Sequence, residues 1–297
     1  MDNVHLVSFA TKGFWSYQDE LVQSAQQFGI KKSFTYRESD LIGSPFHQAH
    51  KHIFNQKRGF GFWLWKPYFI LEALKSVPDG DIIVYVDAAA LFIESPDPLI
   101  QICKNNKAGM VVFDLWPLTN GEWTKRKTFK VMGYDNPIYW NASQVVGGLL
   151  VLRKSAKVMS FIEEWLSFCT NIDILAPDEH DTGKNLPGFQ AHREDQSILA
   201  ILVKRYNIET YRNPCKWGDF LKMPQFRNSN DYIGYPFNLK DTIDDYHSEF
   251  YINSPYATII EFNRKPNVHE PKVTFFKKGL NKIFALGRIL KHSLKKV

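Results

Sequence analysis

Cysteine is scarce in this sequence, and long apolar runs are absent. The three cysteines, Cys103, Cys169 and Cys215, are far apart and odd in number, so no disulfide framework or Cys-x-x-Cys zinc pattern is available. No stretch approaches the ~18 uninterrupted apolar residues of a membrane-spanning helix. The N-terminal stretch MDNVHLVSF lacks the basic region of a secretory signal. We therefore expect a cytoplasmic protein in a reducing compartment, with only peripheral membrane contacts.

Most of the chain also lacks an excess of positive charge, although the whole sequence has a net charge of +6. Eight lysines and arginines, and no acidic residue, fall in residues 271–297. Without these eight, 29 of the 37 basic residues remain against 31 acidic ones, which gives residues 1–270 a net charge of −2. A nucleic-acid groove needs basic residues across the folded body. The charge distribution therefore disfavours nucleic-acid binding and separates a domain over residues 1–270 from a basic tail over residues 271–297.

The hydrophobic content of 44% and charged content of 23% are typical of a globular protein. Short apolar runs predict strands, and amphipathic periodicity predicts helices between them. The expected strands cover residues 5–10, 31–36, 82–86, 110–113, 141–152 and 208–211. The expected helices cover residues 17–28, 67–77, 99–105, 155–169 and 198–206. Residues 115–140 are expected to be irregular. This alternation predicts an α/β fold with a mainly parallel sheet flanked by helices.

The stretch from residue 59 to residue 94 has the clearest pattern. Gly59 and Gly61 alternate with large aromatic residues, which predicts a shaped loop because glycine permits unusual φ angles. Pro67 suits the first turn of the helix that follows, and a Pro-Asp-Gly turn at residues 78–80 ends that helix. Residues 82–86, IIVYV, are apolar and β-branched, as in a strand buried on both faces of a parallel sheet.

Asp87 comes directly after this buried strand and is followed by three alanines. In open α/β sheets, ligands bind beyond the carboxyl ends of the strands. An acidic side chain with small neighbours at that edge is placed to meet a substrate or a metal ion.

A second candidate lies at Asp195 and Gln196, at the start of the helix predicted from the apolar stripe after residue 197. Asp195 is at or near the N-cap of this helix, and aspartate is a favoured capping residue. A purely structural role as a cap therefore stands beside a functional role, in which the acid faces a sugar at the partly positive helix start.

Several segments resemble bacterial GT-A-type glycosyltransferases that build capsule and O-antigen polysaccharides. They are WKPY at residues 65–68, the DGD turn at 79–81, the Tyr85-x-Asp87 strand end and DQSIL at 195–199. The similarity extends from the first strand to about Lys265. It implies a GT-A, Rossmann-like domain. In these enzymes the strand end reads Asp-x-Asp and binds a divalent metal. Here Ala89 replaces the second aspartate, so only Asp87 carries over as a ligand for Mn²⁺ or Mg²⁺.

The resemblance also implies functions for individual side chains. Asp195 and Gln196 are the implied catalytic residues, which orient the donor sugar or, for Asp195, take the proton of the acceptor hydroxyl. The implied donor-binding residues are Ser8, Phe9, Lys66, Asp87, Lys125, Gly147, Gly148, Arg193 and Arg264. Among these, Gly147 and Gly148 leave room for the donor sugar or, alternatively, only permit tight strand packing.

The implied reaction moves a hexose-type sugar from a nucleotide-diphosphate donor, with a UDP-sugar favoured, to a growing lipid-linked glycan at the cell surface. The alternative is a catalytically inactive relative that binds sugars or nucleotides, and Ala89 is the residue that keeps this alternative open.

The basic tail repeats apolar residues at spacings of three and four, with lysine and arginine mostly off that stripe. A basic amphipathic helix of this kind suits the surface of an anionic membrane, where each basic residue contributes ~1 kcal/mol. We therefore expect peripheral attachment to the inner face of the cell membrane. A terminal helix that docks on the body, or that binds a partner, is the alternative.

Overall fold

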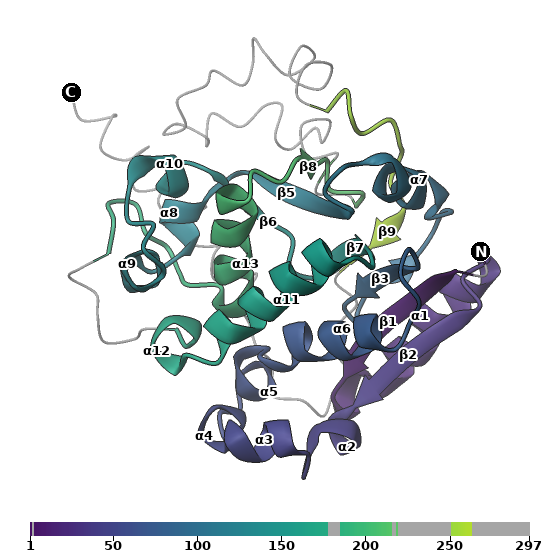
Figure 1. Ribbon diagram of the computed structural model, residues 1–297, viewed down its shortest axis with the longest axis horizontal. Coiled ribbons are helices and arrows are strands. Elements are labelled where there is room, and N and C mark those ends of the chain that lie inside the picture. The colour runs from purple at the N-terminus through teal and green to yellow at the C-terminus, as the bar shows by residue number, and fades with distance from the viewer. Residues whose placement is uncertain (2, 178–184, 216–217, 219–250, 263–297) are drawn as a thin grey trace, which may run out of the picture.

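The computed structural model describes residues 1, 3–177, 185–215, 218 and 251–262 (Figure 1). The predicted basic tail, residues 271–297, lies outside the described residues, as does the predicted donor-binding residue Arg264. The division into residues 1–270 and 271–297 therefore stays a prediction.

A seven-stranded sheet forms the centre of the described structure. Its strands are β1 (Val4–Ala10), β2 (Lys32–Arg37), β3 (Ile82–Val86), β5 (Met110–Thr119), β6 (Ser143–Val145), β7 (Leu149–Arg153) and β8 (Thr210–Tyr211). Their order is β2-β1-β3-β7-β5-β6, and β8 pairs with β5. A separate antiparallel pair consists of β4 (Leu91–Phe92) and β9 (Ile260–Glu261).

The sheet contains both parallel and antiparallel strand pairs. β1 is parallel to β2 and β3, and β8 is parallel to β5. β7 is antiparallel to both β3 and β5, so β3 and β5 run in the same direction. Only β7 and β6 oppose the common direction of the other strands. The predicted α/β class with a mainly parallel sheet is therefore confirmed.

Helices cover both faces of this sheet (Figure 1). The helices of the described residues are the 3-10 turn η1 (Lys12–Phe14) and α1 (Trp15–Gln27), α2 (Glu38–Leu41), α3 (Pro45–Ala49), α4 (Lys51–Phe54), α5 (Gly59–Phe62), α6 (Trp65–Lys75), α7 (Asp97–Asn105), α8 (Asn120–Trp123), α9 (Arg126–Met132), α10 (Pro137–Trp140), α11 (Ala156–Cys169), α12 (Ile172–Leu175) and α13 (Glu194–Arg205).

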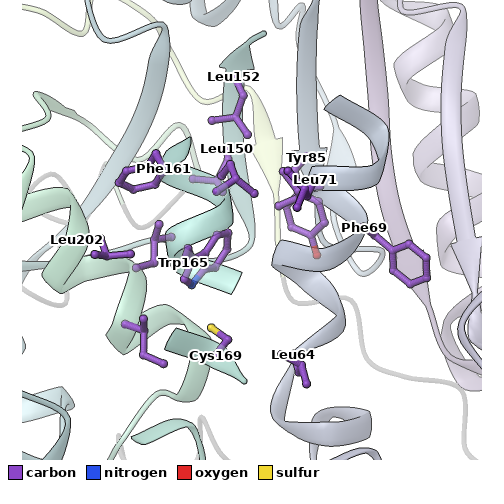
Figure 2. Packing of buried hydrophobic residues seen from close by; sticks show 14 of the residues in the cluster. Leu64, Phe69, Leu71, Tyr85, Leu150, Leu152, Phe161, Trp165, Cys169 and Leu202 are labelled. Carbon is purple, nitrogen blue, oxygen red and sulfur yellow. The ribbon is translucent and has the colours of Figure 1, made fainter. Parts of the chain in front are cut away.

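Alternate side chains of each central strand enter two separate cores. Ile83 and Tyr85 of β3 join the larger core under α6, α11 and α13, and Figure 2 shows Tyr85 and Trp165 of α11 among its residues. Val84 of β3 joins the smaller core under α1 and α7, as do its neighbours Ile82 and Val86. Both faces of β3 are thus buried, as its continuous apolar run predicted. Burial of each such side chain contributes about 1.5–3 kcal/mol.

The prediction of an irregular segment over residues 115–140 is wrong. β5 continues to Thr119, and three short helices, α8, α9 and α10, follow. The Thr119 hydroxyl accepts from the Glu122 N–H, and Glu122 in turn accepts from the Thr119 N–H, so a capping box starts α8. The Asn136 side chain caps α10. Side-chain caps thus start α8 and α10, whereas α9 begins without one.

The predicted single strand over residues 141–152 is two strands, β6 and β7, which pair with β5 on its two sides. Val146, Gly147 and Gly148 lie between them. Pro67 lies in the first turn of its helix, as the sequence predicted, although α6 begins two residues earlier than expected, at Trp65. The Lys66 N–H donates to the Trp63 carbonyl and extends the helix start backwards.

Candidate functional site

Asp87 lies at the carboxyl end of β3, as the sequence predicted. Val86 pairs with Leu149 of the antiparallel β7, so the residues before β7 lie at the same edge of the sheet. The Asp87 N–H donates to the Gly148 carbonyl at 2.9 Å, and the Tyr85 hydroxyl donates to Asp87 Oδ1 at 2.6 Å. Tyr85 and Asp87 share one face because side chains two residues apart on a strand point the same way. The Asp87 side chain is 38% exposed, so it faces solvent at this edge.

Lys66, in the first turn of α6, brings a buried positive charge to Asp87. Its Nζ lies 3.6 Å from Asp87 Oδ1 and 3.1 Å from Asp195 Oδ2. The side chains of Lys66 and Asp195 are each only 5% exposed. We call Lys66, Tyr85, Asp87 and Asp195 the carboxylate–lysine cluster. Three of its members are buried, and Asp87 is the member that solvent reaches.

Asp195 does not cap α13, which resolves the alternative left open by the sequence. The N-cap is Arg193, and Asp195 lies one residue inside the helix. Its carboxylate turns to Lys66, and among the described residues no partner of Asp195 Oδ2 has hydrogen-bond geometry. The Trp165 indole N–H donates to the Asp195 backbone carbonyl at 2.9 Å and fixes this turn against α11. A capping role therefore does not explain this aspartate.

Burial and neighbouring charges set the protonation of the cluster. Burial raises the pKa of Asp195 to about 7, although Lys66 acts in the opposite direction. Burial alone would lower the pKa of Lys66, but the carboxylates of Asp195 and Asp87 outweigh it and raise that pKa. Burial and the Asp87 charge raise the pKa of Tyr85 well above 10. Near neutral pH the cluster thus contains a cationic lysine, a neutral tyrosine and an aspartate close to its ionisation point.

Gln196 follows Asp195 and links α13 to the residues before β7. Its Oε1 accepts from the Gly147 N–H at 3.4 Å, and its Nε2 donates to Gln144 Oε1 at 3.4 Å. Gln144 in turn donates to the Thr124 hydroxyl at 3.0 Å. This chain of amides fixes the side chain of Gln196 beside the cluster.

The two glycines between β6 and β7 allow the cluster to form. A Cβ at Gly148 would lie 2.6 Å from Asp87 Oδ2, and a Cβ at Gly147 would lie 3.0 Å from the Gln196 Cβ. The space beside the glycines is therefore taken by the side chains of Asp87 and Gln196. Contact of the glycines with a donor sugar stays a prediction.

Arg58 and Glu194 form an ion pair beside the cluster, on the side of α5, that no sequence pattern predicted. The Arg58 guanidinium donates to Glu194 Oε1 at 2.7 Å, and Glu194 is buried with a φ of +43°. Phe60, Phe62 and Trp63 also have positive φ values, so the segment ahead of Lys66 is strained. Strained backbone of this kind is concentrated at functional sites. Gly59 and Gly61 have positive φ as expected, but the strained non-glycine residues have no sequence signal.

The other predicted donor-binding residues lie apart from these contacts. Phe9 stacks on Trp65 at 4.1 Å between ring centroids and is core, while the buried Ser8 hydroxyl has no hydrogen-bond partner among the described residues. Lys125 is buried and its ammonium donates to the Ala176 carbonyl at 2.6 Å. The guanidinium of Arg193 lies over the Trp123 ring at 4.4 Å. Their contact with a donor stays a prediction.

The described residues offer a divalent metal ion a poor set of ligands. No group of three or more His, Cys, Asp or Glu side chains in that part of the chain is arranged to hold an ion. Asp87 is the exposed carboxylate of the cluster, and Asp195 is buried against Lys66. Mg²⁺ and Mn²⁺ need several oxygen ligands. The protein side chains of the cluster therefore do not fit the predicted metal site.

The sequence matches no family model and no curated protein sequence. The structure aligns with that of mouse xyloside xylosyltransferase 1 in its apo form, with 13% identity over 90% of this chain and 99% of that chain and a TM-score of 0.43. It aligns with the galactosyltransferase LgtC in complex with donor and acceptor sugar analogues, with 14% identity over 94% of each chain and a TM-score of 0.43. The bifunctional glycosyltransferase WbbM gives 11% identity over 67% of this chain and 37% of that chain, with a TM-score of 0.37. These scores are below 0.5, so the proposals below rest on the residues of the site.

Proposed function

We propose that the protein is a GT-A-type glycosyltransferase. It moves a hexose-type sugar from a nucleotide-diphosphate donor, with a UDP-sugar favoured, to a growing lipid-linked glycan of the capsule or O-antigen kind. The observation that carries this proposal is the carboxylate–lysine cluster at the carboxyl end of β3, where α/β sheets bind their ligands.

Each member of the cluster has a chemical role in this reaction. The exposed Asp87 accepts hydrogen bonds from sugar hydroxyls, and Tyr85 and Lys66 hold its carboxylate in place. The Lys66 ammonium also stabilises the negative charge that develops on the departing diphosphate. Gln196 is held by its own hydrogen bonds next to Gly147 and orients the donor.

Asp195 is the candidate for the proton transfer. In an inverting transfer the acceptor oxygen attacks the anomeric carbon, the bond from that carbon to the diphosphate oxygen breaks, and the hydroxyl proton passes to the Asp195 carboxylate. The nucleoside diphosphate leaves with the electron pair of the broken bond. Burial raises the pKa of Asp195 to about 7, and a base is most effective when its pKa lies near the working pH.

The second candidate function is sugar or nucleotide binding without transfer. Ala89 favours it, because the chain lacks the second acid of the Asp-x-Asp pattern. Donor binding without release of nucleotide, in the presence of a range of acceptors, would support this second function over the first.

We expect the donor to bind at Asp87 and to bind at least about tenfold more weakly to Asp87→Ala. The matched control is Asp79→Ala, which removes a carboxylate that is 83% exposed in the turn before β3. The measurement is calorimetric titration with UDP-glucose and GDP-mannose. Binding to Asp87→Ala as tight as to the wild type, or no nucleotide binding to the wild type, would contradict the proposed donor site.

We also propose that residues 271–297 bring the protein to the cytoplasmic face of an anionic membrane, where it meets a lipid-linked acceptor. None of the described helices has the length and apolar character needed to cross a bilayer. Eight basic and no acidic residues in that tail support attraction to anionic lipid.

Sedimentation with anionic liposomes tests the role of the tail. The full chain should bind them, increasing salt should weaken the binding, and a chain that ends at Glu270 should remain in solution. Neutral liposomes of the same size are the control. Equal binding of the full and shortened chains, or binding that is indifferent to salt, would contradict the proposal.

A further inference from the structure

The position between the two carboxylates of the cluster is already filled by a cation. Lys66 Nζ lies 3.6 Å from Asp87 Oδ1 and 3.1 Å from Asp195 Oδ2. A metal ion bridging Asp87 and Asp195 would have to occupy the same place. The Lys66 side chain is 5% exposed and is enclosed by the start of α6 and by Tyr85, whose ring centroid is 5.8 Å from Nζ. It therefore has little freedom to move aside.

Asp87 alone offers a divalent metal ion too few oxygen ligands. Oδ1 accepts from the Tyr85 hydroxyl and faces Lys66, which leaves Oδ2 as the free carboxylate oxygen among the described residues. Ala89 has no ligand atom. A divalent ion at Oδ2 would also face the positive charge of Lys66, which lies 3.6 Å from Oδ1 of the same carboxylate.

The same geometry suits a neutral polar ligand. Asp87 Oδ2 lies against the Gly148 backbone, where any side chain would collide with it, and the carboxylate is 38% exposed. This carboxylate accepts from the Tyr85 hydroxyl and faces the Lys66 ammonium on one oxygen, and it is partly exposed. It therefore suits hydrogen bonds from sugar hydroxyls, because the acceptor is charged and already oriented.

We propose that Lys66 supplies the positive charge that a divalent metal ion supplies at an Asp-x-Asp site, and that Asp87 binds donor-sugar hydroxyls directly. Donor binding is then independent of metal. This inference rests on the proposed glycosyltransferase function, and it adds that the site binds its donor without a metal ion.

A metal titration tests the first half without any donor. Free Mn²⁺ is followed by electron paramagnetic resonance as wild type and Asp87→Ala are added at metal concentrations up to about 1 mM. We expect the two proteins to leave the same free Mn²⁺ signal. A single site present in the wild type and lost in Asp87→Ala would overturn the inference.

Donor titration tests the second half. The wild type should bind UDP-glucose or GDP-mannose with an affinity that changes by less than about twofold between chelator and added Mn²⁺. A gain of about tenfold or more with Mn²⁺ would overturn the inference. Donor binding in neither condition would overturn the proposed function instead, and the Mn²⁺ titration alone would still decide whether the cluster holds a metal.

The role of Lys66 is isolated by comparing Lys66→Met/Asp195→Asn with Asp195→Asn. The double variant has no buried carboxylate at position 195 that would be left without a counter-charge, so loss of folding does not obscure the result. We expect it to bind donor at least about tenfold more weakly than Asp195→Asn, without rescue by Mn²⁺. Equal affinities of the two variants would overturn the role assigned to Lys66.

Discussion

Replacing Asp195 with asparagine should lower the rate of sugar transfer by about 10²–10⁴-fold, the usual contribution of a positioned base. Asparagine has the same shape but cannot take up the acceptor proton. Asp195 does not cap α13, so the variant loses no cap, and Lys66 keeps Asp87 as a counter-charge, so the loss of stability should be smaller than that of Lys66→Met. Asp173→Asn is the matched control, because that carboxylate is 66% exposed on α12. A fully active Asp195→Asn protein would refute the catalytic assignment.

The pH dependence of the wild type gives an independent check on the same residue. With a pKa of about 7, Asp195 is protonated below that pH and cannot act as a base. The rate should therefore rise as the pH increases from about 6 to 8 and then level off. The residual rate of Asp195→Asn should lack this step. A step of the same size in the variant would assign the titration to another group.

Replacing Lys66 with methionine should destabilise the protein by about 3–5 kcal/mol at pH 8, because it leaves the buried Asp195 carboxylate without its counter-charge. The loss should be smaller at pH 5. Without Lys66 the folded-state pKa of Asp195 rises further above its unfolded value, so stability is retained at low pH and lost as the pH rises. Urea denaturation at the two pH values measures both effects.

The second change Asp195→Asn, added to Lys66→Met, should recover most of that stability, since no buried charge then remains unpaired. The two single variants and the double variant form a thermodynamic cycle that gives the coupling between these residues. A single Lys66→Met variant as stable as the wild type, or a double variant no more stable than the single one, would show that the ion pair does not control stability.

The general fold could be predicted from local patterns. β3 begins and ends where its apolar run predicts, and Asp87 lies at its carboxyl end. These features depend on residues close together in the sequence. The short helices α8 and α10 were missed because side-chain caps such as Asn136 start them, and such caps are weak signals in a stretch rich in polar residues.

The candidate site could be predicted only in part, because it is made by contacts between distant residues. The sequence singled out Lys66, Asp87 and Asp195 separately, but only the structure shows one ammonium between two carboxylates. The Arg58–Glu194 ion pair joins residues 136 positions apart. The positive φ of Glu194 has no sequence signal, since glutamate does not favour that conformation.

The donor site at the carboxylate–lysine cluster is tested most directly by release of nucleotide from a panel of nucleotide-sugars, measured in parallel for the wild type and Asp87→Ala. Asp79→Ala is again the control, as a carboxylate removed from an exposed turn. We expect the wild type and Asp79→Ala to release nucleotide from one donor of the panel, with chelator present, and Asp87→Ala to release at least about a hundredfold less. Release by Asp87→Ala at the wild-type rate, or release from no donor in the panel, would contradict the assignment.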